Sequence, residues 1–420
     1  MTADLVLRNV TLPTGRCADV VIAGGLVRHV GRAVRAEETI DCSRLTCLPG
    51  AVDMHVHMRG GVQAGKEDWR TGTLSAVAGG VTVVVDQPNT VPPITTPDLL
   101  RARVREAKEQ AVCGFAVNAG VTPGADLQGM HDAGAMAFGE TFAAPSSYGD
   151  GLGPETLRGL FTRIHALGGL ATVHAEEVAG PAPATLADHD HARSGAGEAR
   201  AFRTVCALAP GGMRLHFCHA STAASVEAAR GTVEVTPHHL FLSRGMFQEG
   251  DTRARVNPPL RDEETRRALW SRWDRIDVVA SDHAPHTLRE KGLPFEDAPS
   301  GIPGVETMVP LLVAAVRRGE ITLASVIEKT SWRPAAILGI PRAGFLPGDR
   351  ADYALYPDAV TRIDAGRLHA KCGWSPFEGL EAVFPEEVVV RGRRVYACGE
   401  LREAHPAWYP GRGYLSSQVK

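Results

Sequence analysis

Two histidines stand one residue apart in the stretch AVDMHVHMRG, residues 51–60, directly after a run of apolar residues. Successive side chains of a β-strand point to opposite faces, so residues two apart point the same way. At the end of a strand, His55 and His57 would therefore direct two imidazoles into one space. Imidazole nitrogen binds zinc and similar divalent metals. The pair predicts half of a metal site, although such a pair alone could equally be a structural feature of the strand.

Other candidate ligands follow further apolar runs. His174 closes the run GLATVH, His219 closes MRLHFCH, and Asp282 closes IDVVASD. A single histidine after a strand is more often structural than a ligand, but the same placement after several strands is hard to attribute to chance. Together with the first pair, these residues favour a two-metal hydrolytic centre, in which metals activate a water molecule and polarise a carbonyl.

These apolar runs alternate with helical stretches along the middle of the chain. Eight runs are predicted strands: 46–57, 80–89, 114–121, 134–141, 169–176, 213–220, 231–239 and 276–285. Helical patterns separate most of them, as at 96–110, 154–168, 222–231 and 262–273. Short apolar runs that alternate with helices indicate parallel strands joined by crossovers. Eight such units predict an α/β fold, a (β/α)8 TIM-like barrel whose strand ends converge on one mouth. An open, doubly wound sheet is the alternative.

Both ends of the chain differ from this middle. The stretches LVLRNVTL near the start and EEVVVRGRRVYACGEL near the end alternate apolar and polar residues and adjoin turn residues, as short strands do. We therefore expect residues 1–46 and 342–420 to form one small composite β-sandwich domain. The barrel would occupy residues 47–341.

Composition limits the classes of function. The 420 residues carry a net charge of −3, which argues against a nucleic-acid partner or an acidic membrane surface. The eight cysteines are scattered without a CxxC pair, which argues against a disulfide scaffold and a zinc knuckle. The charged start does not resemble a signal peptide, and no apolar run reaches the roughly 20 residues of a membrane helix. We expect a soluble, cytoplasmic protein.

Taken as a set, the motifs resemble those of the dihydroorotases, a branch of the amidohydrolase superfamily, in the monofunctional form of archaea and many bacteria. The resemblance rests on PGAVDMHVHMR and on the stretch KEDWRTGTLSAVAGGVTVVVDQPNTVPP that follows it. Further motifs come in the family's order: VHAEE, LHFCHAST, VEVTPHHLFL, RVNPPLR, SDHAPH and GIPGVET. The similarity covers about residues 1–400.

The resemblance implies a zinc centre, with two ions per chain and other divalent metals possible. Carried over motif by motif, it assigns His55 and His57 to one metal and His174 and His219 to the other, with Asp282 on the first. Three residues before His219, a further histidine at position 216 would face away and is interpreted as structural.

The sequence departs from the family at the fourth strand. Many relatives place a carboxylated lysine there to bridge the metals, and in the matching column this chain has Ala135. Other bacterial relatives bridge with an aspartate in an AFxDDG stretch, whose first aspartate column holds Glu140. We therefore expect Glu140 to be the bridging ligand. Alternatively, Glu140 only forms a hydrogen bond to a neighbour and the centre holds one metal.

The implied substrate carries a carboxylate beside a cyclic ureide. A guanidinium suits a carboxylate, and Arg59 stands two residues after His57, on the same face. Hydantoinases and allantoinases share the HxH motif but lack this HxHxR. Asn89 would be a second carboxylate partner, although its PNT context also suits a simple turn.

The remaining substrate contacts come from later motifs. The resemblance assigns Asn257 and His286 to substrate binding, and the backbone at Ser300 and Gly301 to the ring. His286 could instead be a surface residue of its loop.

The family's reaction is the reversible hydrolysis of (S)-dihydroorotate to N-carbamoyl-L-aspartate in the de novo synthesis of UMP. Asp282 would take a proton from the attacking water and pass it to the leaving ring nitrogen. Two alternatives remain open: a hydantoinase-like or allantoinase-like cyclic amidase, and a non-catalytic homologue that supports aspartate transcarbamoylase. A homodimer and an association with that transcarbamoylase are both compatible with the resemblance.

Two loops complete the predictions. His189 and His191 form a second HxH pair within the segment 178–200, where no strand precedes them, and we expect both to be solvated loop residues. The Gly- and Ser-rich segment 144–154, APSSYGDGLGP, is the candidate for a loop that closes over the substrate.

Overall fold

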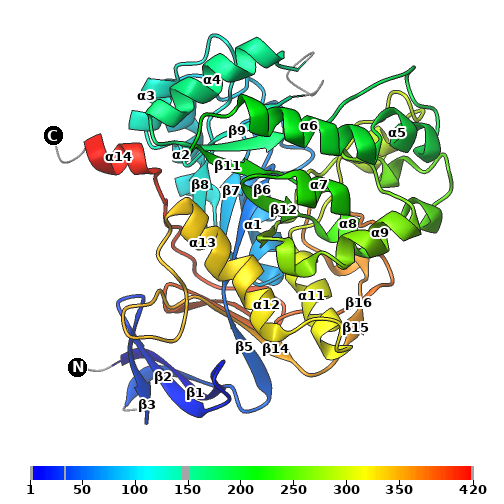
Figure 1. Ribbon diagram of the computed structural model, residues 1–420. Coiled ribbons are helices and arrows are strands. Elements are labelled where there is room, and N and C mark those ends of the chain that lie inside the picture. The colour runs from blue at the N-terminus through cyan, green and yellow to red at the C-terminus, as the bar shows by residue number, and fades with distance from the viewer. Residues whose placement is uncertain (1–2, 33–34, 144–150, 418–420) are drawn as a thin grey trace.

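Eight parallel strands form a closed barrel in the part of the chain that the computed structural model describes, residues 3–32, 35–143 and 151–417 (Figure 1). The strands are β6 (Ala51–Val56), β7 (Val81–Asp86), β8 (Gly114–Val117), β9 (Phe138–Phe142), β10 (Leu170–His174), β11 (Arg214–Phe217), β12 (Thr232–Val235) and β13 (Val278–Val279). Parallel bridges between Ala119 and Phe138 and between Val56 and His283 join the two sheets edge to edge. The predicted (β/α)8 barrel is confirmed, and each strand lies within its predicted run except β9, which extends one residue beyond it, to Phe142.

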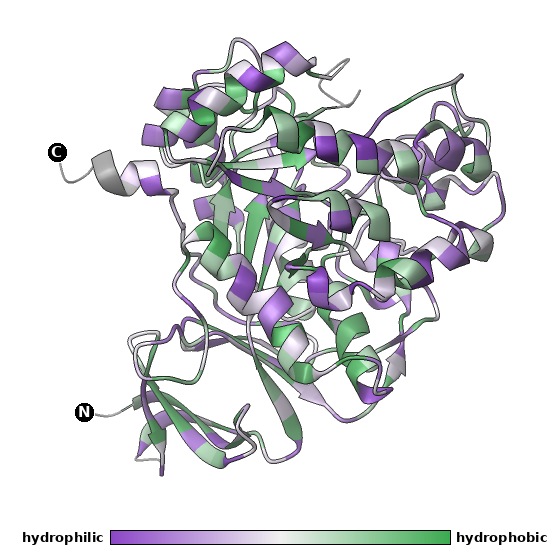
Figure 2. Cartoon of the chain, in the orientation of Figure 1, coloured by the Kyte–Doolittle hydropathy of each residue, from purple (hydrophilic) through white to green (hydrophobic). Residues whose placement is uncertain are grey.

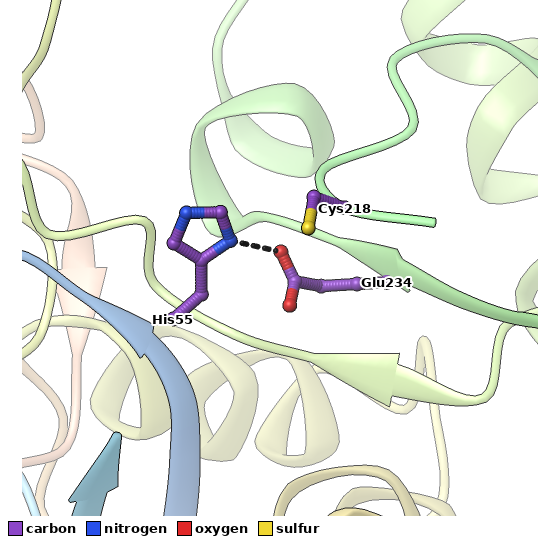
Figure 3. Close-up of side chains that lie close together, drawn as sticks. All are labelled: His55, Cys218 and Glu234. Carbon is purple, nitrogen blue, oxygen red and sulfur yellow. Dashed lines mark hydrogen bonds and ion pairs between the residues drawn. The ribbon is translucent and has the colours of Figure 1, made fainter. Parts of the chain in front are cut away.

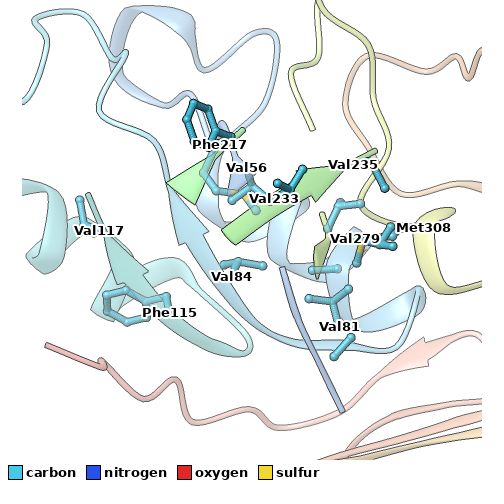
Figure 4. Packing of buried hydrophobic residues seen from close by; sticks show 14 of the residues in the cluster. Val56, Val81, Val84, Phe115, Val117, Phe217, Val233, Val235, Val279 and Met308 are labelled. Atoms are coloured by element: carbon cyan, nitrogen blue, oxygen red, sulfur yellow. The ribbon is translucent and has the colours of Figure 1, made fainter. Parts of the chain in front are cut away.

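The barrel strands are buried on both faces, as parallel strands under a layer of helices must be. All six residues of β7, VTVVVD, are buried. Val84 packs in the large core between strands and helices, whereas Val83 and Val85 belong to a second apolar cluster. Figure 4 shows the large core, where strand valines meet Phe115, Phe217 and Met308. Figure 2 shows the same concentration of hydrophobic residues along the central strands.

Helices surround the strands, and local sequence sets where several of them begin. The side chain of Thr96 caps α2 by accepting the backbone N–H of Leu99, and Pro97 follows at the first helical position. The α-helices are α1 (Trp69–Ala78), α2 (Pro97–Gln110), α3 (Leu127–Asp132), α4 (Pro154–Ala166), α5 (Leu186–Ala192), α6 (Gly195–Leu208), α7 (Ala223–Ala228), α8 (Pro237–Phe241), α9 (Glu263–Trp270), α10 (Leu288–Lys291), α11 (Met308–Arg317), α12 (Leu323–Ile327), α13 (Arg333–Leu338) and α14 (Arg412–Ser417). Short 3₁₀ helices are η1 (Gly61–Gln63), η2 (Arg244–Met246), η3 (Thr252–Ala254), η4 (Trp273–Arg275) and η6 (Ala365–Arg367), and η5 (Glu328–Trp332) is a π-helix.

Strands from both ends of the chain form a smaller β-structure beside the barrel (Figure 1). One sheet has the order β3-β2-β1-β4 and the other β19-β18-β17-β14-β5. The strands are β1 (Ala3–Thr11), β2 (Cys17–Ala23), β3 (Leu26–Gly31), β4 (Ala36–Asp41), β5 (Leu45–Pro49), β14 (Tyr353–Pro357), β17 (Glu387–Val390), β18 (Arg393–Ala397) and β19 (Glu400–Leu401), with a separate pair β15 (Thr361–Arg362) and β16 (Glu381–Ala382). Leu7 and Ile22 pack with Tyr353 and Val389 in one apolar core.

The chain passes from this β-structure into the barrel at Gly50. The predicted strand 46–57 is wrong in one respect, because it is two strands, β5 and β6, that belong to different sheets. The backbone N–H of Gly50 donates to the carbonyl of Asp352 at 2.8 Å. A Cβ atom at position 50 would lie 2.3 Å from the Thr82 hydroxyl oxygen, so only glycine fits this passage. The predicted domain boundary after residue 46 falls inside β5.

Two segments of the C-terminal part return to the barrel. The segment around Trp408 runs beside β8, where the N–H of Phe115 donates to Ala407 and the N–H of Tyr409 donates back to Phe115, each at 2.8 Å. His369 donates its backbone N–H and directs its ring Nδ1 to the two oxygens of Glu306, each at 2.8 Å. Within the described ranges, no helix is long and apolar enough to cross a membrane.

The His369–Glu306 pair predicts a pH-dependent contribution to stability. The hydrogen bond to Glu306 raises the pKa of His369 above its usual 6.5. The hydrogen bond therefore stabilises the folded protein fully below pH 6.5, where His369 is protonated in both states. Between pH 6.5 and the raised pKa, unfolding releases the proton, and the stabilisation is lost as the pH rises through this range. We expect Glu306→Gln to lower the free energy of unfolding at pH 6 more than at pH 9, measured by urea unfolding. An equal loss at both pH values would contradict the assignment.

Candidate metal centre

Six predicted ligands converge at the mouth of the barrel, at the ends of five strands. They are His55 and His57 from β6, Glu140 on β9, His174 on β10, His219 after β11 and Asp282 after β13. None of the six is more than 6% exposed. Four imidazoles and two carboxylates are therefore held together away from bulk water.

The first group of donors is formed by His55, His57 and Asp282. The Nε2 atoms of His57 and His55 lie 3.2 and 3.4 Å from the Asp282 Oδ1 atom. Asp282 adopts a φ of 45°, in the left-handed region that non-glycine residues rarely occupy. Such conformations cluster at functional sites, because only the surrounding structure maintains them.

The second group contains His174, His219 and Glu140. Glu140 Oε1 lies 3.1 Å from His174 Nδ1 and 2.8 Å from His219 Nε2, and these two nitrogens are 3.1 Å apart. The other oxygen of Glu140, Oε2, lies 3.7 Å from His55 Nε2 in the first group. Glu140 thus faces both groups with its two oxygens. Ala135, in contrast, lies before β9 at the other end of the strand, against Gly411.

The two groups fit divalent metal ions. Ligand atoms that surround a tetrahedral zinc at about 2.0–2.1 Å are about 3.3 Å apart. The donor distances within the two groups, between 2.8 and 3.4 Å, bracket that value. The Nε2 atom of His55 has no hydrogen-bond partner among the described residues, although it is buried. An imidazole nitrogen in that situation is suited to a metal ligand.

A buried carboxylate supports His55 from behind, as Figure 3 shows. Glu234 Oε1, on β12, accepts from His55 Nδ1 at 2.9 Å, which leaves Nε2 free to bind a metal. Burial raises the pKa of Glu234, but His55 and His216 outweigh it, so the pKa is well below its usual range. Cys218 lies beside this pair, and burial raises the pKa of its thiol to about 12, which keeps it neutral.

A second buried carboxylate supports His174. Glu176 Oε2 lies 2.7 Å from His174 Nε2 and accepts from Arg193 at 2.5 Å. Burial alone would lower the pKa of His174, but its hydrogen bonds to Glu140 and Glu176 outweigh burial and raise the pKa to about 9. Burial raises the pKa of Glu176, yet Arg193 and His174 together hold it well below its usual range.

Sequence reasoning missed both supporting carboxylates, although signals for them exist. Glu234 is a lone acidic residue within the apolar strand TVEV, and Glu176 follows His174 by two positions, as residues that share a face of a strand do. His216, predicted to be structural, is buried and lies with its Nε2 atom 3.3 Å from Glu234 Oε2.

A cavity of 810 Å³ opens beside the donor groups. Every predicted site residue except His55 lines it: His57, Arg59, Asn89, Glu140, His174, His219, Asn257, Asp282, His286, Ser300 and Gly301. His55 lies beneath the cavity floor, fully buried. The structure thus brings the predicted metal ligands and the predicted substrate contacts to one space.

One wall of the cavity is cationic. The guanidinium of Arg59 lies 3.4 Å from His286 Nε2, which is 3.1 Å from the Ser300 carbonyl oxygen. Lys66, which sequence reasoning missed, donates to His286 Nδ1 at 3.3 Å. Burial, followed by the charges of Arg59 and Lys66, lowers the pKa of His286 so far that its ring is neutral. A neutral His286 can donate from Nε2 while it accepts from Lys66 at Nδ1.

Gly301 and two asparagines complete the lining. Gly301 has a φ of 134°, and a Cβ atom there would lie 2.6 Å from the Ala284 carbonyl oxygen, so the position requires glycine. Asn89 Nδ2 lies 3.5 Å from Glu140 Oε2. The side-chain oxygens of Asn89 and Asn257 are buried without a hydrogen-bond partner in the described part of the chain, as expected of groups that contact a ligand.

The prediction for the second HxH pair is wrong at His189. Both histidines lie in α5, and His191 is exposed, but His189 is buried and its Nε2 atom lies 3.0 Å from the carbonyl oxygen of Val256, which lines the cavity. Burial lowers the pKa of His189 to about 4, so the ring is neutral. The predicted closing loop, 144–154, lies outside the described residues from 144 to 150.

Comparison with known proteins identifies the family that this chain matches. Residues 46–395 match the family model described as the amidohydrolase family. The dihydroorotase of Halobacterium salinarum is 40% identical over 405 residues, covering 93% of this chain and 96% of the relative. The dihydroorotase of Methanosarcina acetivorans is 37% identical over 431 residues, covering 95% of this chain and 91% of the relative.

Solved structures with the same fold carry different names. The L-hydantoinase (dihydropyrimidinase) of Arthrobacter aurescens is 26% identical, with a TM-score of 0.90 over 98% of this chain and 100% of that chain. The dihydropyrimidinase of Brevibacillus agri is 24% identical, with a TM-score of 0.86 over 97% of this chain and 99% of that chain. At 24% identity, the likeness to the Brevibacillus agri structure supports the fold alone.

The buried pair of Arg193 and Glu176 predicts a large loss of stability when its cation is removed. Arg193→Met would leave the Glu176 carboxylate buried and short of a cation, which we expect to lower the free energy of unfolding by about 3–5 kcal/mol. The matched control is Arg200→Met, because Arg200 and Glu177 form an ion pair whose side chains are 54% and 45% exposed. That variant should lose less than about 1 kcal/mol. Equal losses in urea unfolding would refute this interpretation.

Proposed function

Since the chain belongs to the amidohydrolase family, we propose that it is a dihydroorotase, a cyclic amide hydrolase that converts (S)-dihydroorotate and water reversibly into N-carbamoyl-L-aspartate. Archaeal relatives that bear this name are 32–40% identical over most of the chain. In the reverse direction the reaction closes the ring, a step of pyrimidine synthesis.

The observation that carries the proposal is the presence of a guanidinium and a hydrolytic donor cluster in one cavity. Dihydroorotate joins a carboxylate to a ring amide, so it needs both. Arg59 offers the planar fork that matches a carboxylate, Asn89 adds an amide donor, and neutral His286 would contact the substrate from the same wall of the cavity. Asn257 and the backbone of Ser300 and Gly301 would hold the ring.

Two divalent metals, for which zinc is our first choice, would lower the pKa of the attacking water and polarise the ring carbonyl. We assign the first to His55, His57 and Asp282, and the second to His174 and His219, with Glu140 between them. Glu140 would thus replace the carboxylated lysine of other relatives, because its two oxygens face the two groups.

Asp282 is our candidate for the general acid and base. Burial raises the pKa of Asp282, but the neighbouring His55 and His57 outweigh it and lower the pKa, so the carboxylate is ionised and can accept a proton. Asp282 would take the proton from the attacking water as the amide bond of the ring is attacked. It would return that proton to the ring nitrogen as the bond to the carbonyl carbon breaks.

Three further features remain proposals. All eight cysteines are free thiols, which suits the reducing cytoplasm where this reaction would take place. A homodimer and a complex with aspartate transcarbamoylase are compatible with the family, and size measurements on the purified protein would test them.

The activity is tested with the purified full-length chain, supplied with zinc and dihydroorotate. We expect formation of N-carbamoyl-L-aspartate, and we expect Asp282→Ala to lower kcat by about 10²–10⁴-fold or more, because proton transfer is lost. If Asp282→Ala keeps most of its activity, the assigned role is wrong. Turnover of hydantoin or allantoin without turnover of dihydroorotate would identify another cyclic amidase. Zinc binding without turnover on any of the three would favour a non-catalytic homologue.

Glu140 is tested by counting metals. We expect two zinc ions per chain in the wild type and one or none in Glu140→Ala, because the carboxylate whose two oxygens face the two donor groups is removed. Metal analysis of the dialysed proteins measures the ratio. Two ions retained in Glu140→Ala would exclude the bridging role.

A further inference from the structure

Glu234 touches both groups of metal ligands although it is neither a predicted ligand nor part of the cavity wall. Its Oε1 atom accepts from His55 Nδ1 at 2.9 Å and from the backbone N–H of His219 at 3.1 Å. Its Oε2 atom lies 3.3 Å from His216 Nε2. The side chain is 1% exposed.

The position of Glu234 in the barrel explains this reach. β12 lies between β11 and β13, the strands that lead to His219 and to Asp282. From the interior of β12 the carboxylate lies against the chain after β11 and reaches His55 on β6 (Figure 3). A carboxylate buried this deeply needs a donor on each oxygen, and these three contacts provide them.

We propose that Glu234 is a positioning residue that couples the two halves of the metal centre, so that filling one half prepares the other. The proposal rests on the metal centre assigned above and goes beyond it, because it adds a second link, behind the ligands, to the one that Glu140 provides between the two groups. Glu234 acts on the metals only through His55 and His219.

The effect on His55 is chemical. A carboxylate that accepts from Nδ1–H fixes the tautomer in which Nε2 carries the lone pair, and it makes that nitrogen more basic. The Nε2 atom of His55 is the one that faces Asp282 and Glu140. Without Glu234, the ring could place its proton on Nε2, and that nitrogen could then not bind a metal.

The effect on His219 is conformational. Its φ of 36° lies in the left-handed region, which a residue with a side chain occupies only when its surroundings hold it there. The hydrogen bond from its backbone N–H to Glu234 is one such restraint. This restraint keeps the ring of His219 directed at Glu140 and His174.

Coupling follows because one oxygen serves both donors. A metal that orders His55 also orders Glu234 Oε1, and an ordered Oε1 restrains the backbone of His219 before the second metal arrives. The second metal then binds to a group that is already ordered, which is positive cooperativity. We therefore expect zinc to bind the metal-free wild type cooperatively.

The test is a titration of metal-free, full-length protein with zinc alone, in competition with a chromophoric chelator. Glu234→Gln keeps the size of the side chain but loses its charge, and its amide offers only one good acceptor atom. We expect zinc affinity to fall about 10- to 100-fold at both sites, as is typical for residues that orient ligands. We also expect the cooperativity to decrease, because only the Glu140 link between the two groups remains, while two ions still bind at saturating zinc.

Two variants complete the design. Glu306→Gln is the matched control, because Glu306 also accepts a hydrogen bond from a histidine, the partly buried His369. Glu306 lines no part of the cavity and contacts no predicted ligand. Its zinc affinity should equal that of the wild type. His216→Leu removes a donor from Glu234 without removing a contact to a ligand, so it should weaken zinc binding in the same direction but less.

The outcomes separate the two proposals. A wild type that binds no zinc overturns the metal centre itself. A wild type that binds two ions, together with Glu234→Gln of unchanged affinity, overturns the positioning role alone. If Glu234→Gln weakens only one of the two sites, the coupling is wrong. If Glu234→Gln does not fold, as judged by circular dichroism of the metal-free protein, the zinc affinity of His216→Leu decides, and an unchanged affinity there refutes the role.

Discussion

Charges can remain in the centre of this barrel only because each buried carboxylate meets a buried cation or hydrogen-bond donor. Glu140 lies between His174 and His219, Glu234 accepts from His55, and Glu176 accepts from His174 and Arg193. The contacts form one continuous network from the cavity floor to the layer behind it. Imidazoles that are held in this way present their remaining nitrogens to a common space, which is what metal binding requires.

The barrel supplies the rigid frame for that network. The strands are buried on both faces and rich in valine, whose branched side chain suits the strand, so the strand ends are fixed relative to one another. The candidate metal ligands come from those ends, whereas Arg59, His286 and Gly301 come from the loops beyond them. Gly50 and the pair His369–Glu306 connect the smaller β-structure to this frame.

The fold by itself does not identify the substrate, because solved structures of the same shape are named hydantoinases and dihydropyrimidinases. The distinguishing feature is local. A guanidinium, a neutral imidazole and two asparagines share the cavity with the hydrolytic cluster, and this combination suits a ring amide that also carries a carboxylate.

Local sequence was sufficient to predict the type and order of the barrel elements, because hydrophobic periodicity and helix caps act over a few residues. It also predicted that His55 and His57 lie together at a strand end, since the pleat places both on one side. Tertiary structure decided the rest. Glu234 lies 179 residues from His55, so their contact depends on which strands are neighbours around the barrel. For the same reason the sequence could not reveal that His189 is buried or that the first predicted strand breaks at Gly50.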